Sequence, residues 1–341
     1  MNNTKKILQK NIRSFLVILS VPVNFFCYSQ DIHFSQYFAS PLSLNPALAG
    51  QYEGDFRFMT NYKNQWMAVS KNSFKTFAAS ADAAIYKKKI FAGLSFFNDK
   101  AGDAKMGTNA IHLSLASKIS LNDNNSLVAG IQTGWAQRSV DINGVTWDSQ
   151  FDGKIFDNTL PSGETEFPAN YSYFDISSGV YWKCNVNNNV IVDAGVAAFH
   201  LNSPKQSYYG NGDRLHPKLA FHGSSEIKTQ NKNYTYVPSF MILTQGATNE
   251  FNLGMMVRYN LGMDSKYTGI NVSSNIFFGA YYRIKDAAIL CFQYEYKNTF
   301  ALGISYDINL SKLRTASYFR GGGEISLSYK LFRPQKSMPR I

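Results

Sequence analysis

Cysteine, proline and charge are all scarce in this chain. Its 341 residues include only 3 cysteines and 10 prolines, and 17% of them are charged. Cys184 and Cys291 have neither the spacing of a metal site nor that of a CxxC pair, so we expect two unpaired small residues in strands. The length excludes a disulfide-stapled miniprotein, and a hydrophobic content of 45% excludes a disordered chain.

Long hydrophobic runs are also missing beyond residue 29. The most apolar segments, 276–282 and 287–292, have about six or seven residues, whereas a membrane-spanning helix needs about 20. We therefore expect no transmembrane helix. Apolar residues at helical spacing with capping signals are not evident there either, so the pattern predicts no helix after residue 29.

Residues 1–29 have the features of a cleaved signal peptide. Four basic residues and no acidic one accompany the apolar stretch 15–26, and small residues precede Gln30 at the −3 and −1 positions. A lipoprotein anchor at Cys27 is the alternative, but Phe26 stands where a lipobox needs a small residue. Cleavage removes four of 34 basic residues and leaves 30 against 23 acidic ones, which lowers the net charge from +11 to +7. That charge is too diffuse to indicate nucleic-acid binding.

From residue 55 onward, apolar residues alternate with polar or small ones. Phe300, Leu302 and Ile304, for example, are separated by Ala301 and Gly303, which is typical of strands with two unlike faces. The pattern predicts strands at 55–68, 73–86, 90–98, 107–120, 126–140, 171–184, 189–200, 217–228, 234–245, 249–261, 270–285, 287–297, 299–309 and 321–332. Most have about 10–15 residues, which exceeds the ~5–6 of soluble proteins and suits the ~9–11 of a tilted strand crossing a bilayer.

The connections between these strands are unequal at the two ends. Short turns rich in Asn, Lys and Gly are predicted at 87–89, 122–125, 185–188, 229–233, 262–269 and 297–298, and longer loops at 99–106, 141–170, 201–216 and 311–320. Such asymmetry is typical of outer-membrane barrels, whose short turns face the periplasm. Because an open sheet edge cannot face lipid, the strands must close. We therefore predict an all-β fold: a transmembrane, antiparallel, up-and-down β-barrel of about 14 strands over residues 55–332.

The two faces of the predicted strands differ in chemistry. Aromatic residues lie near strand ends, where they suit the membrane interfaces: Trp135 and Tyr306 at the outer ends, and Trp182, Tyr259, Tyr294, Tyr296 and Tyr329 at the inner ends. Ordinary strand preference is the alternative explanation. The opposite face carries charges of both signs, which predicts an ion-paired, partly plugged lumen: Arg57, Asp82, Lys118, Asp175, Asp193, Arg258, Arg283, Glu295, Asp307, Glu324 and Lys330.

Two clusters invite chemical interpretations. His222, Ser224 and Glu226 share one strand face, but successive members of the set lie about 7 Å apart along the strand. The sequence also shows no oxyanion hole near them, so we interpret them as lumenal polar residues. The loop 141–170 carries six acidic residues together with Trp147 and Phe151. We consider three interpretations of this loop: it contacts a partner, it is simply solvated, or it binds calcium. Its spacing does not match the EF-hand pattern of calcium sites.

Residues 30–54 alternate poorly. Pro41 and Pro46 indicate an extended or turning segment that precedes the first strand and lies either in the periplasm or in the lumen. It contains Phe34-Ser35-Gln36-Tyr37, Pro41-Leu42, Leu44-Asn45-Pro46-Ala47 and Gly50, and this series resembles the N-terminal signature of the PorP/SprF family of type IX secretion outer-membrane proteins. Weaker matches at 80–85, 99–102, 200–204 and 323–329 extend the resemblance over residues 30–332.

The resemblance implies a non-enzymatic, cofactor-free protein of the outer membrane of a Gram-negative, Bacteroidetes-type bacterium. Its implied partners are the lipid bilayer, other type IX secretion components in the periplasm or outer membrane, and a secreted cargo, such as a gliding adhesin, received through the cargo's C-terminal domain. As candidate partner-binding residues we name Phe34, Gln36, Tyr37, Asn45, Pro46, Trp147 and Phe151. For Asn45, Pro46 and their neighbours in the motif, a role in packing is the alternative. Residues 333–341 are expected to form a periplasmic tail. A passive porin or uptake channel is the alternative function, and an outer-membrane hydrolase is the third.

Overall fold

The computed structural model describes residues 31–332 apart from 68–72, 103, 142–144, 158, 162, 164–169, 209–211, 231–232, 263–273 and 313. The predicted signal peptide at 1–29 and the predicted tail at 333–341 lie outside the described residues. Among the described residues, no helix has the length and apolar character needed to cross a bilayer.

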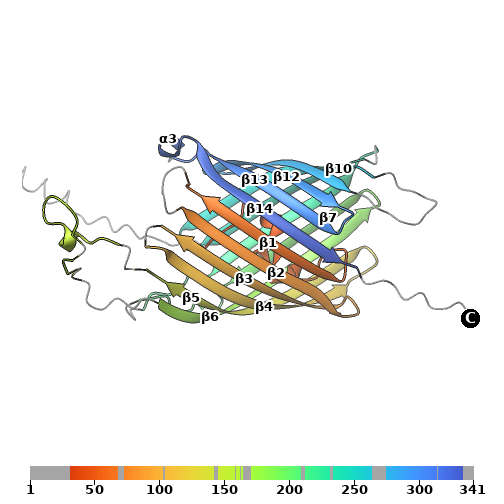
Figure 1. The fold of residues 1–341 in the computed structure, drawn as a ribbon. Coiled ribbons are helices and arrows are strands. Elements are labelled where there is room, and N and C mark those ends of the chain that lie inside the picture. The colour runs from red at the N-terminus through yellow and green to blue at the C-terminus, as the bar shows by residue number, and fades with distance from the viewer. Residues whose placement is uncertain are drawn as a thin grey trace, which may run out of the picture. The chain divides into compact units, whose positions relative to one another are not determined.

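Fourteen antiparallel strands form one closed barrel (Figure 1). The strands are β1 (Phe56–Gln65), β2 (Phe74–Tyr86), β3 (Ile90–Ala101), β4 (Met106–Ser120), β5 (Asn125–Ser139), β6 (Asn170–Asn187), β7 (Val190–Phe199), β8 (Lys218–Lys228), β9 (Tyr234–Gln245), β10 (Thr248–Asn260), β11 (Asn275–Arg283), β12 (Ala287–Tyr296), β13 (Phe300–Asn309) and β14 (Arg320–Leu331). Each strand pairs with its neighbours in sequence, and β1 pairs with β14 from Phe56↔Leu331 to Gln65↔Gly322 to close the sheet. The predicted fold class and strand number are confirmed.

Several strand ends differ from the prediction by one to five residues. β3 continues to Ala101 and β6 to Asn187, because the loop and turn residues assigned there pair with the neighbouring strand. β11 begins only at Asn275, and the part of the predicted strand at 270–273 lies outside the described residues. Most of the short turn predicted at 262–269 also lies outside them.

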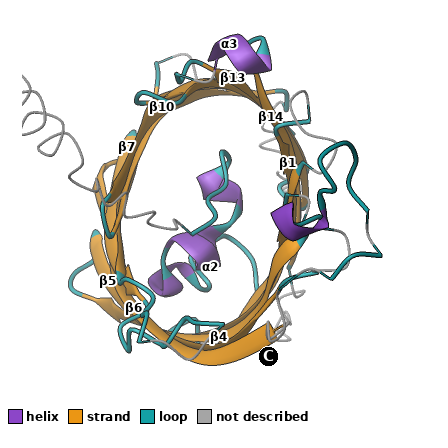
Figure 2. Ribbon diagram, turned by 90° about the vertical axis from the view of Figure 1, so that its left-hand side faces the viewer, coloured by secondary structure: helices purple, strands orange, loops and turns teal. Residues whose placement is uncertain are grey.

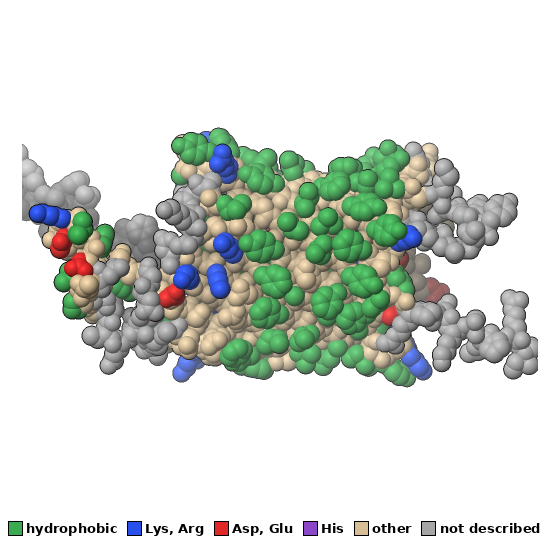
Figure 3. All heavy atoms as spheres, in the orientation of Figure 1, with side chains coloured by type: hydrophobic (Ala, Val, Ile, Leu, Met, Phe, Trp, Pro, Cys, Tyr) green, Lys and Arg blue, Asp and Glu red, His purple; other side chains and the backbone are tan. Residues whose placement is uncertain are grey.

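The outer wall of the barrel is apolar. In β13, Phe300, Leu302, Ile304 and Tyr306 are exposed while the residues between them point inward. Figure 3 shows hydrophobic side chains spread over the wall, with lysine and arginine side chains near its two margins. This arrangement matches a lipid-facing band between two aqueous regions.

The two ends of the barrel carry different connections. The short-turn end, which faces the periplasm in outer-membrane barrels, comprises 87–89, 121–124, 188–189, 229–233, 261–274 and 297–299. The long-loop end comprises 66–73, 102–105, 140–169, 200–217, 246–247, 284–286 and 310–319. Two connections at the long-loop end, 246–247 and 284–286, are tight hairpins, in agreement with the predicted strand bounds.

Residues 31–54 lie inside the barrel (Figure 2). They form three short helical turns, η1 (Tyr37–Ala39), α2 (Pro41–Leu44) and η2 (Pro46–Leu48). The prediction of no helix after residue 29 is wrong here, and α3 (Arg314–Ser317) is a further short helix in a loop. Pro41 and Pro46 occupy first-turn positions, where the missing N–H costs nothing, so they start these turns. We call residues 31–54 the plug segment.

Candidate functional site

The plug segment runs the length of the lumen. It starts at the long-loop end, where Asp31 contacts His200 and Lys218, and it ends at the short-turn end, where Glu53 accepts a hydrogen bond from Asn298. Between these points it packs on the inner faces of opposite sides of the barrel. The interior that the sequence predicts to be ion-paired and partly plugged is thus occupied by the chain's own N-terminal residues.

The outer end of the plug segment is held by charges. The Asp31 carboxylate lies 2.6 Å from His200 Nε2 and 3.1 Å from Lys218 Nζ. Its backbone N–H donates to Gln245 at 2.8 Å. Two residues further on, the His33 carbonyl accepts a hydrogen bond from the fully buried Lys63 at 2.9 Å. A buried cation without such a partner would be costly, so these contacts fix the segment and stabilise the wall together.

Ser35 and Gln36 are bound by carboxylates from the last two strands. Glu324 accepts from both backbone amides, at 2.8 Å from Ser35 and 3.2 Å from Gln36. The Ser35 hydroxyl donates to Asp307 at 2.7 Å, and Arg283 also binds Asp307 at 2.8 Å. Hydrogen bonds to ionised groups are stronger than those between neutral groups, which makes this cluster a strong attachment of the segment to β13 and β14.

Tyr37 joins the plug segment to an apolar part of the wall. Its hydroxyl donates to Ser239 at 2.9 Å, and its ring packs edge-on against Tyr281 with centroids 5.8 Å apart. Leu44 enters the same buried cluster, which includes residues of β7 to β12. A second apolar cluster surrounds Leu42 and Ala47 on the side of β3 to β6. The segment therefore bridges opposite walls with hydrophobic contacts as well as hydrogen bonds.

Asn45 is fully buried between the plug segment and the barrel wall. Its amide nitrogen donates to the Val180 carbonyl at 3.0 Å and lies 3.1 Å from His222 Nε2, while its oxygen accepts from the Ala47 N–H at 2.9 Å and caps η2. Strand glycines make room for it: a Cβ added at Gly179 would lie 2.1 Å from Asn45 Oδ1. A Cβ at Gly130 would lie 2.5 Å from the Ala47 backbone nitrogen.

Asp82 fixes the inner end of the plug segment. It is 2% exposed, accepts two hydrogen bonds from Arg57 at 2.7 and 2.9 Å, and accepts a third from the Gly50 N–H at 2.7 Å. Tyr52 donates to the Asp82 carbonyl at 2.7 Å, and its ring lies under the Arg57 guanidinium. Gly50 has a φ of 71°, which favours glycine.

The structure brings together five of the seven predicted partner-binding residues. Phe34, Gln36, Tyr37, Asn45 and Pro46 are all buried against the barrel's own inner wall. Their binding of an external partner stays a prediction. The sequence does not identify five other residues of the site: Ser35, Gly130, Arg57, Asp82 and Glu324. The charge pattern places the last three in the lumen, but no local signal shows that they bind residues 31–54.

Trp147 and Phe151 lie far from the plug segment in sequence and belong to the long loop 140–169. This loop contains η4 (Asp148–Gln150), where the Gln150 side chain accepts from the Trp147 N–H at 3.1 Å. Phe151 pairs with Phe156, with ring centroids 5.1 Å apart, and is exposed. Backbone amides of Ile155 and Lys154 lower the pKa of the Asp152 carboxyl. The described residues contain no group of metal-ligating side chains, and Glu164 and Glu166 of the calcium interpretation lie outside them.

The triad-like set on β8 does not act as a unit. His222 contacts Asn45, Ser224 donates to Asp193 at 2.6 Å, and Glu226 binds Arg258 at 3.0 Å. Each side chain has a separate lumenal partner, as the interpretation of polar lumen residues requires. Cys184 and Cys291 are free and lie in strands, as predicted.

Comparisons with known proteins give a family and a fold. A family model described as type IX secretion system membrane protein PorP/SprF matches residues 26–329. No curated protein matches the sequence. Among solved structures, the toluene transporter TbuX of Ralstonia pickettii has a TM-score of 0.51 at 10% identity and covers 86% of this chain and 94% of its own. A FadL homologue of Pseudomonas aeruginosa has a TM-score of 0.47 at 12% identity, with coverages of 86% and 94%. At such identities the likeness to TbuX shows the barrel fold alone.

Proposed function

Because the chain belongs to the PorP/SprF family of type IX secretion system membrane proteins, we propose that it supports the secretion and surface attachment of a cognate partner. In this proposal the partner is a secreted protein, such as a gliding adhesin, that is received through its C-terminal domain. Other components of the secretion system bind the barrel from the periplasm or within the outer membrane. The fold and the family both indicate an outer-membrane protein.

The plugged lumen is the observation that supports this proposal most. A segment held by an ion pair at Asp31 and by a hydrogen bond to a buried carboxylate at Gly50 is suited to a stable platform rather than to passive flux. The long loop with exposed Phe151 provides an apolar contact at the outer end, and we propose that Trp147 and Phe151 bind the partner there. The motif residues Phe34, Gln36, Tyr37, Asn45 and Pro46 hold the segment in a form that the machinery binds.

Deletion of the gene tests this function. We expect one secreted protein to disappear from the cell surface while other outer-membrane proteins keep their abundance, because only the cognate cargo depends on this platform. Quantitative proteomics of surface-shaved peptides and of the culture medium measures this. Re-expression of the intact gene should restore display, and unchanged surface and secreted proteomes in the deletion strain would refute the proposal.

A further inference from the structure

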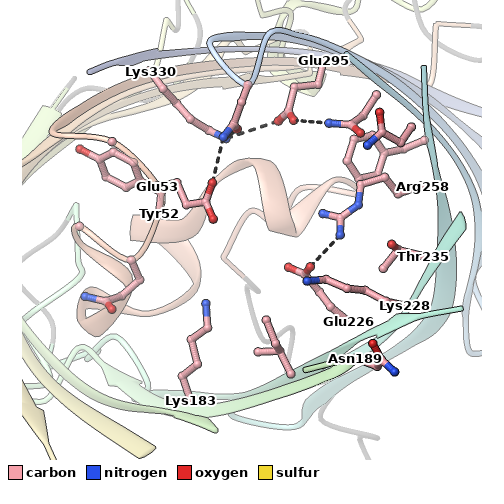
Figure 4. A pocket seen from close by; sticks show the side chains of 18 of the residues that line it. Tyr52, Glu53, Lys183, Asn189, Glu226, Lys228, Thr235, Arg258, Glu295 and Lys330 are labelled. Atoms are coloured by element: carbon pink, nitrogen blue, oxygen red, sulfur yellow. Dashed lines mark hydrogen bonds and ion pairs between the residues drawn. The ribbon is translucent and has the colours of Figure 1, made fainter. Parts of the chain in front are cut away.

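A large hollow lies at the short-turn end of the lumen, beside residues 50–54 of the plug segment (Figure 4). Its volume is about 780 Å³, within the range of about 300–1,000 Å³ that is usual for ligand pockets. Residues 50–54 of the plug segment line one side, and inward-facing residues of strands around the barrel line the rest. We call this hollow the vestibule. The interactions that hold the plug segment in place involve only part of this lining, such as Glu53 and Asn298.

The vestibule is positively charged. Six cationic side chains line it, from Lys88, Lys118, Lys183, Lys228, Arg258 and Lys330. Three carboxylates face them, from Glu53, Glu226 and Glu295, which leaves an excess of three positive charges. Cations gathered in a cavity with low-dielectric walls raise the local potential and concentrate anions. The net charge of the lining therefore selects a negatively charged ligand.

Three of these lysines stand apart from the others. Arg258 binds Glu226 at 3.0 Å, Lys330 binds Glu295 at 3.4 Å, and Lys88 lies 3.6 Å from Asp55. Within the described part of the chain, Lys118, Lys183 and Lys228, which come from β4, β6 and β8, form no ion pair, although Lys183 lies opposite Asp193 in the pairing of β6 with β7. All three lysines line the same hollow. Like charges held together in a lumen are stabilised when an anion binds between them.

The remaining lining is suited to a polypeptide. Asn189, Asn260 and Asn275 line the vestibule together with threonine and glutamine side chains. Amide side chains both donate and accept hydrogen bonds, as peptide groups do. The vestibule lies inside the barrel and away from the lipid-facing wall, so the acyl chains of an anionic lipid could not stay in the bilayer while its headgroup bound there.

We propose that the vestibule binds a carboxylate-rich polypeptide segment that enters from the periplasm, with Lys118, Lys183 and Lys228 binding its acidic side chains. This inference rests on the proposed function for the presence of such a partner and names that partner's chemistry. The binding itself is a property of the purified barrel and is measured without the secretion machinery.

The test uses full-length protein in zwitterionic detergent and a fluorescein-labelled peptide of repeating aspartate and glycine. We expect saturable binding by fluorescence anisotropy, and weak or no binding of the matched peptide that carries asparagine in place of aspartate. Raising the ionic strength from about 0.1 M to about 1 M shortens the screening length from ~10 to ~3 Å and should weaken binding strongly. Equal binding of the two peptides would overturn the proposal without any variant.

A triple variant locates the binding. We expect binding of the acidic peptide to weaken about tenfold in a variant that combines Lys118→Gln, Lys183→Gln and Lys228→Gln. Lys75→Gln, Lys105→Gln and Lys205→Gln remove the same charge near the long-loop end and should leave binding unchanged. Equal losses in both variants would overturn the proposal, as would complete displacement of the peptide by an equal concentration of inorganic phosphate. A barrel that binds no acidic peptide but is still required for cargo display would refute the vestibule site and leave the proposed function standing.

Discussion

Gly130→Leu should loosen the attachment of the plug segment to the lumen while the barrel stays folded. A Cβ at this position would lie 2.5 Å from the Ala47 nitrogen and 2.6 Å from the Pro46 carbonyl carbon. These are backbone atoms, so no rotamer change relieves the clash and the segment itself must move. Overpacking of this kind costs about 1–3 kcal/mol, which corresponds to about 5–150-fold in the equilibrium between docked and released segment.

Hydrogen exchange measured by mass spectrometry detects this release directly. Amides of residues 36–50 should exchange faster by that factor, while amides of the strands keep their protection. Gly323→Leu is the matched control, because a Cβ added at this strand glycine meets no atom within 4 Å. Unchanged exchange of residues 36–50 in the Gly130→Leu variant would show that the segment does not rest against Gly130.

Asp82→Ala should destabilise the barrel and its inner attachment together. The substitution leaves the buried Arg57 guanidinium without its carboxylate and the Gly50 N–H without its acceptor. Removing one partner of a buried ion pair costs about 3–5 kcal/mol, because the remaining charge stays uncompensated. Urea unfolding in lipid vesicles, followed by tryptophan fluorescence, should show a lower midpoint with an unchanged slope.

A double variant distinguishes charge from packing in this result. Arg57→Leu combined with Asp82→Ala removes both members of the pair, so no charge is left unpaired, and we expect it to unfold at a higher urea concentration than Asp82→Ala alone. A double variant less stable than the single one would mean that Arg57 acts through packing on Tyr52 rather than through its charge.

The barrel was predictable from sequence because each strand encodes its own two faces. The alternation of Phe300, Leu302 and Ile304 with small residues needs no distant partner to be recognised, and strand length then selected a membrane barrel. Errors in the predicted strand bounds were confined to strand ends such as those of β3 and β6, where residues assigned to the connection also pair with the neighbouring strand.

The position of the plug segment was not predictable in the same way. The inner face of a barrel strand is polar whether water or protein fills the lumen. The strand pattern therefore does not indicate whether residues 30–54 lie in the periplasm or in the lumen. Ser35 and Glu324 are 289 positions apart, and nothing local to either residue indicates that they bind. Asn45-Pro46 did carry a local signal, since an N-cap residue followed by proline starts a helical turn. The roles of Gly130 and Gly179 depend on a close approach that only the fold reveals.

Planar-bilayer conductance tests the central claim, that the chain's own N-terminal segment closes the lumen. The intact protein should give no steady large conductance, and a variant lacking residues 34–50 should give stable open channels, because the polar wall would then line water. Both proteins must show the strand content of a folded barrel by circular dichroism. Steady large channels from the intact protein, unchanged by the deletion, would contradict the account and favour a passive porin.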